Sequence, residues 1–415
     1  MNLKPYPKYK DSGIEWLGKI PEGWGVERLK WIAHLEYGSS LSEEAREEGS
    51  VPVFGSNGIV GEHSKSITDK PVIIIGRKGS YGKVSYSDVP CFPIDTTYYI
   101  DPCLTKENIR WLYYLLSSIA LDKITFDTGV PGLSREFAYS KVVPFPSRNE
   151  QITIANYLDH KTTRIDELIK NNERLIELLK EKRQAIISHA VTKGLDANAK
   201  MKDSGIEWIG EIPEGWRVKK IKYVAEIVLG KMLQNDDSGK DELKPYMRAQ
   251  NIQWETVDIN DVKEMWFSDY EIKKYRLQKG DLLISEGGEV GRTALWNGEP
   301  EECYIQNSVH KVTVDKKLAN NKYLLYLLET YGKWGYFESI VNRVSIGHLT
   351  REKLKENEII CPPKNEQSQI VTYLDKKTSI IDESIKNIQS QIEILKEYRQ
   401  TLISNVVTGK VRIAD

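Results

Sequence analysis

The sequence predicts an α/β (α+β) fold with two globular domains and two long helices that pair as an antiparallel coiled coil, arranged as an internal pseudo-two-fold repeat. Three observations support this prediction: a tryptophan-containing motif occurs twice, a long heptad-patterned segment occurs twice, and the regions between them share a skeleton. Self-similarity on this scale indicates a repeated architecture before any single residue is considered. We place the globular domains at 1–146 and 196–362, and the long helices at 147–195 and 363–415.

The tryptophan motif is Asp-Ser-Gly-Ile-Glu-Trp-Leu-Gly at residues 11–18 and Asp-Ser-Gly-Ile-Glu-Trp-Ile-Gly at residues 203–210. Each copy continues into Ile-Pro-Glu-Gly-Trp, which ends at Trp24 and at Trp216. The Pro-Glu-Gly step is typical of a turn. We interpret Trp16 and Trp24 as anchors in a core or an interface.

The regions between the repeated motifs differ in length but share a skeleton. Apolar strands are expected at Ile73–Ile75 and at Leu282–Ile284. A loop of the pattern Gly-x-x-Gly followed by a basic residue comes after each strand, at 79–83 and at 288–292. The second region is the longer one because of an insertion, part of which lies around 258–274.

Two long segments carry the same heptad pattern. Counting in sevens from Leu158 and from Leu374 places mostly apolar residues at the a and d positions, which is the pattern of a coiled-coil seam. The predicted seam consists of Leu158, Ile165, Ile169, Ile176, Leu179, Arg183, Ile186, Leu374, Ile381, Ile385, Ile388, Ile392, Leu395, Arg399 and Leu402. Antiparallel pairing within the chain is favoured because the intervening globular region must return the chain to start the second helix. Pairing with another chain is the alternative.

Short polar motifs repeat at the start of each long segment. Asn-Glu-Gln occurs at 149–151 and at 365–367, and Tyr-Leu-Asp occurs at 157–159 and at 373–375. Upstream of the first segment, Ser134 is placed to cap a short helix.

Where the scaffold repeats, the chemistry of the loops changes: Arg77-Lys78 in the first copy corresponds to Glu286-Gly287 in the second. Arginine and lysine can contact guanine or phosphate, asparagine and glutamine can bond adenine, and glycine lets the backbone approach phosphate closely. This pattern suits two modules that recognise different DNA targets, although plain divergence of solvated loops would also produce it. The candidate DNA-binding residues are Ser56, Asn57, His63, Arg77, Lys78, Ser80, Tyr81, Lys83, Thr96, Thr97 and Arg135 in the first copy, and Arg248, Gln250, Asn251, Glu289, Arg292, Gln306, Asn307, Ser308, His310, Arg343, Ser345, His348 and Arg351 in the second. Because Arg135 and Arg351 are shared, they are better suited to the DNA backbone or the fold than to sequence recognition.

The composition restricts the function in a few ways. The formal net charge is −1, so binding to nucleic acid would require local basic patches or partners that supply positive charge. The four cysteines are widely spaced, which favours buried apolar roles over metal or disulfide roles. The N-terminus lacks the apolar segment of a signal peptide, and no apolar run approaches the ~20 residues of a membrane span. We therefore expect a cytoplasmic protein.

Motifs of catalysis are scarce. The spacing from Gly13 to Lys19 matches a Walker A loop, but Ile20 occupies the position where serine or threonine must bind magnesium. No HExxH, GxSxG or zinc-ligand spacing occurs in the sequence. We expect no catalytic residue, metal site or cofactor in this chain. A nuclease or methyltransferase with an unrecognised active site, and a structural coiled-coil adaptor, remain as alternatives.

The duplicated tryptophan motif, the Asn-Glu-Gln and Tyr-Leu-Asp motifs and the Gly-x-x-Gly loops together resemble the specificity subunit of type I restriction-modification enzymes, over nearly the whole chain. The resemblance implies two target recognition domains, each of which recognises one half of a bipartite, asymmetric site in double-stranded DNA. It implies that the helices set the spacing and dock two modification (methyltransferase) subunits, and that restriction (translocase-nuclease) subunits join for cleavage. S-adenosylmethionine would then belong to the methyltransferase partner, and ATP and magnesium to the restriction partner.

Overall fold

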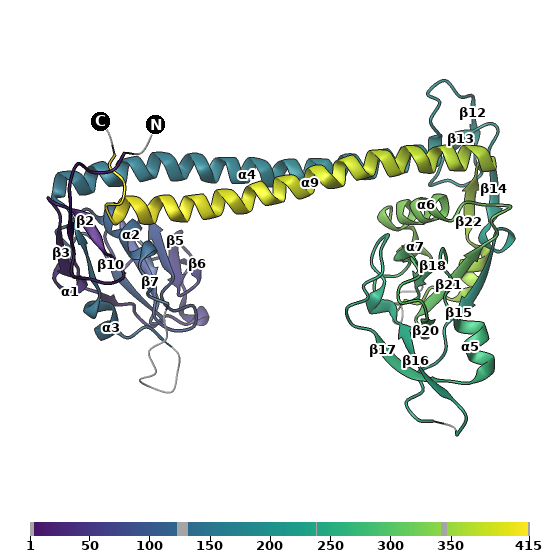
Figure 1. Ribbon diagram of the computed structural model, residues 1–415, viewed down its shortest axis with the longest axis horizontal. Coiled ribbons are helices and arrows are strands. Elements are labelled where there is room, and N and C mark those ends of the chain that lie inside the picture. The colour runs from purple at the N-terminus through teal and green to yellow at the C-terminus, as the bar shows by residue number, and fades with distance from the viewer. Residues whose placement is uncertain (1–3, 123–131, 238, 342–346, 414–415) are drawn as a thin grey trace. The chain divides into compact units, whose positions relative to one another are not determined.

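The computed structural model describes residues 4–122, 132–237, 239–341 and 347–413. Contacts within the chain divide it into two units (Figure 1), one formed by residues 1–173 with 388–415 and the other by residues 174–387. Each unit therefore combines one globular region with a part of each long helix.

The described residues of the first unit form a four-stranded sheet, a three-stranded sheet and two ladders. The four-stranded sheet is antiparallel and has the order β4-β10-β7-β8, with β4 Glu36–Tyr37, β10 Thr97–Ile100, β7 Val72–Gly76 and β8 Val84–Ser87. The other sheet has the order β6-β5-β9, with β6 Gly58–His63, β5 Val51–Gly55 and β9 Phe92–Pro93. The ladders pair β1 Tyr9–Asp11 with β2 Lys19–Pro21, and β3 Gly25–Arg28 with β11 Val142–Phe145. The helical segments are α1 Leu29–Ile32, η1 Glu43–Ala45, α2 Ile109–Ser118 and α3 Arg135–Ser140.

The second unit repeats this topology. Its four-stranded sheet has the order β15-β21-β18-β19, with β15 Ala225–Leu229, β21 Val309–Val314, β18 Leu282–Ser285 and β19 Thr293–Leu295. Its other sheet is β17-β16-β20, with β17 Lys263–Phe267, β16 Glu242–Met247 and β20 Tyr304–Ile305. The ladders pair β12 Met201–Asp203 with β13 Glu211–Pro213, and β14 Arg217–Lys220 with β22 Glu358–Cys361. The helical segments are η2 Ile221–Tyr223, η3 Ala249–Asn251, α5 Asp269–Tyr275, α6 Asn321–Lys333, α7 Tyr336–Ile340 and α8 Arg351–Glu356. The equivalent strand orders confirm the predicted internal repeat.

Local sequence explains where the short helices begin. The side chain of Ser134 accepts a hydrogen bond from the backbone N–H of Phe137, at 3.2 Å, and so caps α3 as predicted. Thr350 caps α8 in the same way, by accepting from the N–H of Lys353 at 3.4 Å. These caps satisfy backbone donors that a helix leaves unpaired at its start.

The long helices are α4, Arg148–Lys193, and α9, Lys364–Val407. The N-terminal part of α4 lies in the same unit as the C-terminal part of α9, and the reverse holds in the other unit, so the predicted antiparallel arrangement is confirmed. Every residue of the predicted seam is buried or half-buried. In the first unit, Arg399 Nε lies 2.9 Å from Asp166 Oδ1. None of the helices in the described part of the chain combines the length and the apolar character needed to cross a membrane.

The repeated polar motifs attach each long helix to its own globular region. Gln151 accepts a hydrogen bond from the backbone N–H of Asn108 at 3.0 Å, and Gln367 accepts from the N–H of Asn320 at 2.8 Å. The aspartates of the Tyr-Leu-Asp motifs make matching contacts in the two units. Tyr114 donates to Asp159 at 2.6 Å, and Tyr326 donates to Asp375 at 2.8 Å. The motifs therefore recur because each unit contains the same helix-to-domain junction.

The tryptophan motifs are supported by the ends of the long helices. Lys410, just after α9, donates from Nζ to the carbonyls of Leu17 and Lys19. Lys193, the last residue of α4, donates in the same way to the carbonyls of Ile209 and Glu211. Each motif is therefore bound by a lysine at the end of a long helix.

The tryptophans within these motifs have different environments. Trp24 and Trp216 are each 1% exposed and are core residues of the first and second unit, respectively. Trp16, by contrast, is 51% exposed, so it does not anchor a core, and its role in an interface stays a prediction. Nearby in the first unit, the backbone N–H of Arg412 donates to the carbonyl of Lys4 at 2.7 Å.

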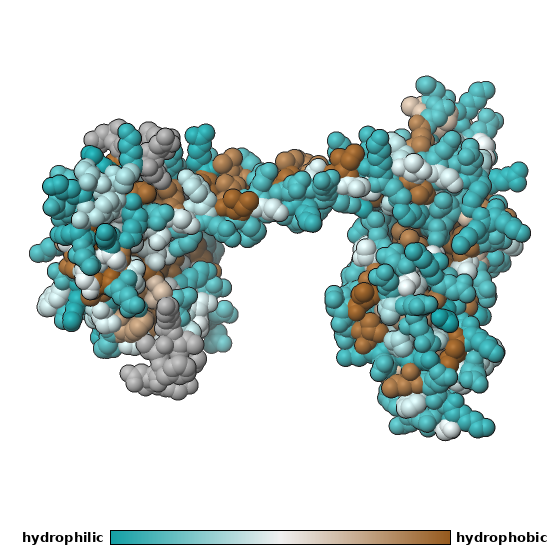
Figure 2. Space-filling view, viewed as in Figure 1, coloured by the Kyte–Doolittle hydropathy of each residue, from teal (hydrophilic) through white to brown (hydrophobic). Residues whose placement is uncertain are grey.

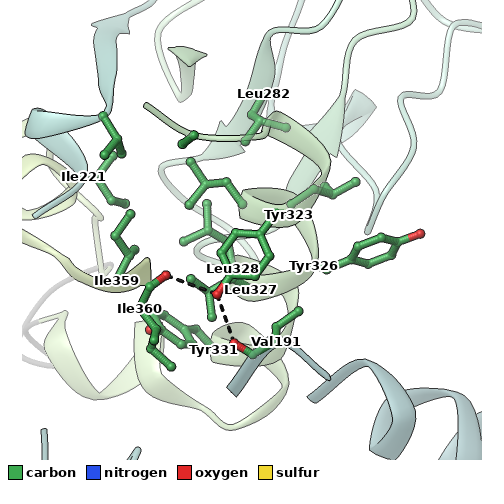
Figure 3. Close-up of a cluster of buried hydrophobic side chains, with 14 of the residues drawn as sticks. Val191, Ile221, Leu282, Tyr323, Tyr326, Leu327, Leu328, Tyr331, Ile359 and Ile360 are labelled. Carbon is green, nitrogen blue, oxygen red and sulfur yellow. Dashed lines mark hydrogen bonds between the residues drawn. The ribbon is translucent and has the colours of Figure 1, made fainter. Parts of the chain in front are cut away.

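The core of the second unit contains a tyrosine that joins three elements. Tyr323 on α6 is 2% exposed, and its hydroxyl lies 3.0 Å from the carbonyl of Val191 on α4 and 3.2 Å from that of Ile360 on β22 (Figure 3). Tyr331, about two turns further along α6, is also buried, but its hydroxyl has no hydrogen-bond partner among the described residues.

We predict that Tyr323→Phe lowers the free energy of unfolding of the second unit by about 1–3 kcal/mol, because two buried carbonyls lose their shared donor. Tyr331→Phe is the matched control and should not lower stability, since it removes a buried hydroxyl that has no hydrogen-bond partner among the described residues. Urea unfolding of the full chain measures both. Equal losses for the two variants would contradict the assigned role of Tyr323.

Candidate nucleic-acid interface

The loop between β7 and β8 is closed by backbone hydrogen bonds. The N–H of Gly76 donates to the carbonyl of Lys83 at 2.8 Å, and the N–H of Gly82 donates to the carbonyl of Gly76 at 2.8 Å. Gly82 has a φ of +78°, which glycine adopts without strain. The loop therefore turns tightly and presents the side chains between Arg77 and Lys83 at the end of the central strands.

Two neighbouring turns meet this loop. The backbone N–H of Arg77 donates to the carbonyl of Thr96 at 2.8 Å. Lys83 Nζ donates to both the carbonyl and the side-chain Oδ1 of Asn57, each at 2.8 Å. The structure thus brings together, as one surface, the sequence-predicted candidates Ser56, Asn57, Arg77, Lys78, Ser80, Tyr81, Lys83 and Thr96.

Two arginines of the first unit share an aromatic ring. The guanidinium carbon of Arg77 lies 5.1 Å from the centre of the Tyr37 ring, and that of Arg135 lies 4.7 Å from it. Arg77 Nε is buried and has no hydrogen-bond partner among the described residues. Cation–π contacts of this kind orient a guanidinium while leaving its outer N–H donors available. Tyr37 was not among the candidates, because a single tyrosine at a strand end carries no signal of its own.

The second unit builds the equivalent loop between β18 and β19. The N–H of Gly291 donates to the carbonyl of Ser285 at 2.9 Å, and the N–H of Ser285 donates to the carbonyl of Arg292 at 2.9 Å. The neighbouring turn is attached as in the first unit, because the N–H of Glu286 donates to the carbonyl of Ser308 at 2.8 Å. The predicted correspondence of residues 79–83 with residues 288–292 is therefore a correspondence of backbone geometry.

The side chains around the second loop differ from those of the first. Arg292 Nη1 donates to Gln253 at 3.3 Å and lies 3.7 Å from Glu289. Trp254 donates from its indole N–H to Glu289 at 2.7 Å. Gln253 and Trp254 were missed in the sequence because they lie in the segment that replaces the short β5–β6 turn of the first unit. The available signal in the sequence was Trp254, a tryptophan in a polar segment that has no counterpart in the first copy.

A cluster of charged side chains lies beside this segment: Glu329 is buried, Arg183 and Glu255 are half-buried, and Asp382 is exposed. Arg183 Nη2 lies 2.7 Å from Glu255, Nε lies 2.9 Å from Asp382, and Nη1 lies 3.8 Å from Glu329. Burial, followed by the nearby Glu255 carboxylate, raises the pKa of Glu329 to about 8 against the opposing effect of the Arg183 guanidinium. The protein environment therefore favours the protonated form of Glu329 more than water does.

Several predicted DNA contacts are corrected by their burial. Thr97 is fully buried, and its hydroxyl donates to the carbonyl of Ile94 at 2.7 Å. His63 is buried and accepts from the backbone N–H of Glu47 at 3.0 Å. Both residues support the fold, because a side chain that is enclosed and already hydrogen-bonded has no surface to offer a base.

Two residues of the second unit need the same correction. Asn251 is 2% exposed, and its amide donates to the carbonyls of Asp258 and Asp261 at 2.9 and 3.1 Å. His310 is fully buried at hydrogen-bond distance from the Leu349 carbonyl, and burial lowers its pKa.

The remaining candidates have partly or fully exposed surfaces. Arg248 pairs with Asp261, and Arg351 lies 3.2 Å from Glu352. Those that are exposed or half-buried are Arg248, Gln250, Glu289, Arg292, Gln306, Asn307, Ser308, His348 and Arg351. Arg343 and Ser345 lie outside the described residues. Met232 and Leu233, which are 75% and 52% exposed, adjoin this surface through Lys231 and were not predicted, since apolar residues were sought in the core.

Comparison with known proteins identifies similar chains. Residues 21–180 and 213–394 match the family described as the type I restriction modification DNA specificity domain. The type I restriction enzyme MjaIX specificity subunit of Methanocaldococcus jannaschii is 24% identical over 98% of this chain and 97% of its own length. The EcoKI specificity subunit of Escherichia coli is 20% identical over 95% of this chain and 90% of its own.

Solved structures share the fold at low identity. A chain from a study of complex assembly in a type I R-M system aligns with a TM-score of 0.69 at 16% identity, covering 94% of this chain and 98% of that chain. The HsdS subunit from Thermoanaerobacter tengcongensis aligns with a TM-score of 0.53 at 18% identity, covering 94% of this chain and 98% of its own.

Proposed function

The chain belongs to the family of type I restriction-modification DNA specificity domains, and from this premise we propose how it acts: each of its units recognises one half of a bipartite, asymmetric site in double-stranded DNA. In a type I restriction-modification complex this chain recognises DNA, as predicted from the sequence. Catalysis resides in partner subunits. The alternatives of an unrecognised nuclease or methyltransferase, and of a structural adaptor, find no support in these similarities.

One observation carries the proposal of two separate half-sites. The same loop backbone, closed by the same hydrogen bonds, recurs in both units, but Arg77 and Lys83 in one correspond to Glu286 and Arg292 in the other. Arginine, glutamine and asparagine can discriminate bases through paired hydrogen bonds. Two identical frames with different side chains would give two different base preferences, and therefore an asymmetric target.

We assign the target recognition domains to residues 1–146 and 196–362, and the spacer helices to 147–195 and 363–415. The helices would set the spacing between the half-sites. The loop residues retained as DNA contacts exclude Thr97, His63, Asn251 and His310, which are buried. They are Ser56, Asn57, Arg77, Lys78, Ser80, Tyr81, Lys83, Thr96, Arg248, Gln250, Glu289, Arg292, Gln306, Asn307, Ser308 and His348. Arg135 and Arg351 are assigned to DNA backbone contacts or to positioning.

The helices also offer a surface for two modification subunits. Hydrophobic residues are visible along α4 and α9 outside the globular parts (Figure 2). Exposed apolar residues of these two helices include Leu168, Leu175, Ile380 and Ile394, which are 47%, 44%, 54% and 63% exposed. Exposed apolar side chains at positions outside the seam support docking of a partner. In such a complex S-adenosylmethionine would be held by the modification subunits, and ATP and magnesium by the restriction subunits.

Long-read methylation mapping tests the proposed function. The chain is co-expressed with its modification subunit in a host that lacks other DNA methylation, and the genome is sequenced. A split, asymmetric methylated motif is the expected result. A contiguous motif, or no methylation despite a stable complex, would contradict the proposal.

We predict that Arg77→Ala and Arg292→Ala each relax recognition of one half-site. A bidentate arginine contact contributes about 1–3 kcal/mol of base discrimination, so single-base discrimination in that half should fall by about tenfold. Each variant is the control for the other, because the half-site of the unaltered unit should keep its specificity. The measurement is the methylation rate on duplexes with single base substitutions in each half. An equal fall in the methylation rate on every duplex, whichever half carries the base substitution, would show that the arginines contact phosphate and not bases.

A further inference from the structure

Arg183 is a half-buried arginine on α4 whose guanidinium binds two other elements. Its side chain is 16% exposed. Nε binds Asp382 on α9, while Nη2 lies 2.7 Å and 2.9 Å from the two carboxylate oxygens of Glu255. A planar guanidinium can bind several carboxylates at fixed angles, which a lysine cannot do. Arg183 therefore connects the helix pair to the segment that contains Glu255.

Glu255 holds an unusual backbone conformation next to the candidate DNA-binding loop. Its φ is +67°, which costs a non-glycine residue about 1–2 kcal/mol. Its N–H donates to the carbonyl of Thr293 at 2.9 Å, and its carbonyl accepts from the N–H of Leu295 at 3.2 Å. Glu255 is thus fastened to β19, directly after Arg292. Backbone strain of this kind persists where the surroundings impose it, and it occurs most often at functional sites.

The residues on either side of Glu255 reach the DNA-binding loop itself. Gln253 accepts a hydrogen bond from Arg292, and Trp254 donates one to Glu289. The Trp254 ring packs so closely on α6 that a Cβ at Gly332 would lie 2.1 Å from it. The path from Arg183 through Glu255 to Gln253 and Arg292 is therefore continuous, and it runs entirely within the second unit.

We propose that Arg183 is a positioning residue for DNA recognition by the second unit, which acts by holding Glu255 and, through it, Gln253 against Arg292 and Trp254 against Glu289. This inference rests on the proposed function of the second unit. It implies that recognition of one half-site depends on the local conformation of α4, and that the other half-site lacks this dependence.

The first unit provides the internal control. Arg399 occupies the seam position equivalent to Arg183 and pairs with Asp166 as Arg183 pairs with Asp382. Ser117 stands where the second unit has Glu329. A turn of Ser56 and Asn57 joins β5 to β6 where the second unit has the longer segment with Glu255. In the described part of the first unit, no carboxylate from the globular region joins Arg399 in an ion pair.

Glu255→Gln is the most informative variant. It removes the charge that Arg183 holds while leaving the ion pair of Arg183 with Asp382 in place, so the helix pair is preserved. Arg183→Gln removes the same contact from the other side, and Arg399→Gln is the matched control in the first unit. Thermal unfolding of each full chain shows whether it is folded before recognition is measured.

The assay uses the complex with its modification subunits and duplexes that carry the mapped target with single base substitutions. Glu255→Gln should reduce base discrimination in the second half-site by about tenfold, and Arg183→Gln combined with it should add little, because the two residues act through one contact. Discrimination in the first half-site should stay unchanged. Hydrogen exchange of the segment 252–258 should become faster in both variants, and Arg399→Gln should leave it unaltered.

Unchanged discrimination in the second half-site, or an equal loss in both halves, would overturn the inference. If Arg183→Gln does not fold, the base discrimination of Glu255→Gln in the second half-site decides the test. A wild-type complex that recognises no bipartite site would overturn the proposed function itself. If the wild-type complex recognises a bipartite site and Glu255→Gln keeps the same base discrimination, this inference alone is overturned.

Discussion

Gly291→Ala is expected to lower the free energy of unfolding of the second unit by about 2–5 kcal/mol, which combines the cost of a left-handed backbone with that of overpacking. Gly291 has a φ of +80°, and a Cβ there would lie 2.2 Å from the ring of Phe337. Phe337 is fully buried, so its ring cannot move away without opening the core. The variant should lose recognition of the second half-site together with stability, because Arg292 follows directly in the loop.

Gly288→Ala is the matched control in the same loop. Gly288 has a φ of +73°, but a Cβ there would meet nothing within 4 Å. Its substitution should cost about 1–2 kcal/mol from the backbone alone. Urea unfolding of the two variants separates the contributions of conformation and contact. Equal losses in the free energy of unfolding would mean that the Phe337 ring moves aside without cost and that the loop is not tightly packed against it.

Trp24→Ala and Trp216→Ala are each expected to cost about 3–5 kcal/mol, because each removes a large buried side chain and leaves a cavity. Trp24 packs against Tyr6, with ring centres 5.8 Å apart. The Trp216 ring lies next to Gly194, just after α4, so that a Cβ at Gly194 would be 3.3 Å from it. Each substitution should lower the unfolding temperature of its own unit. Calorimetry of the full chain should resolve which transition shifts.

The exposed counterpart Trp16→Ala serves as the control and should change stability by less than about 1 kcal/mol, since Trp16 is 51% exposed. The indole N–H groups of Trp24 and Trp216 have no hydrogen-bond partner among the described residues, so the expected loss comes from packing. A shift of both transitions by either variant would indicate that the units do not unfold independently.

The elements that local physics specifies were predictable from the sequence. The heptad pattern predicted the seam, and residues such as Ile165 and Ile392 are buried as that pattern requires. Ser134 was predicted as a cap because serine before a helix satisfies free N–H groups, and it makes the expected bond. The alignment of the Gly-x-x-Gly loops was predictable because Gly82 and Gly291 both need a positive φ.

The details of the candidate interface depended on contacts between distant segments, which the sequence does not display. His310 looked like a DNA-binding residue beside Asn307 and Ser308, but its place on β21 turns it into the core. The connection between Arg183 and Glu255 spans 72 positions in the chain and follows from the fold of the second unit. Tertiary packing therefore decided which polar residues stay accessible.

The matching support that Lys410 and Lys193 give to the tryptophan motifs bears on the order of the segments in the chain. In the first unit, the segment after α9 binds residues 17–19 as the end of α4 binds residues 209–211 in the second. In the second unit the chain runs directly from the end of α4 into the tryptophan motif. In the first unit the segment after α9 is distant in sequence from the motif and reaches it through hydrogen bonds. A tryptophan motif can thus be held in place by a helix end that does not directly precede it in sequence. For the evolution of such chains, a unit of motif, domain and helix could therefore be duplicated or circularly permuted with these lysine contacts kept.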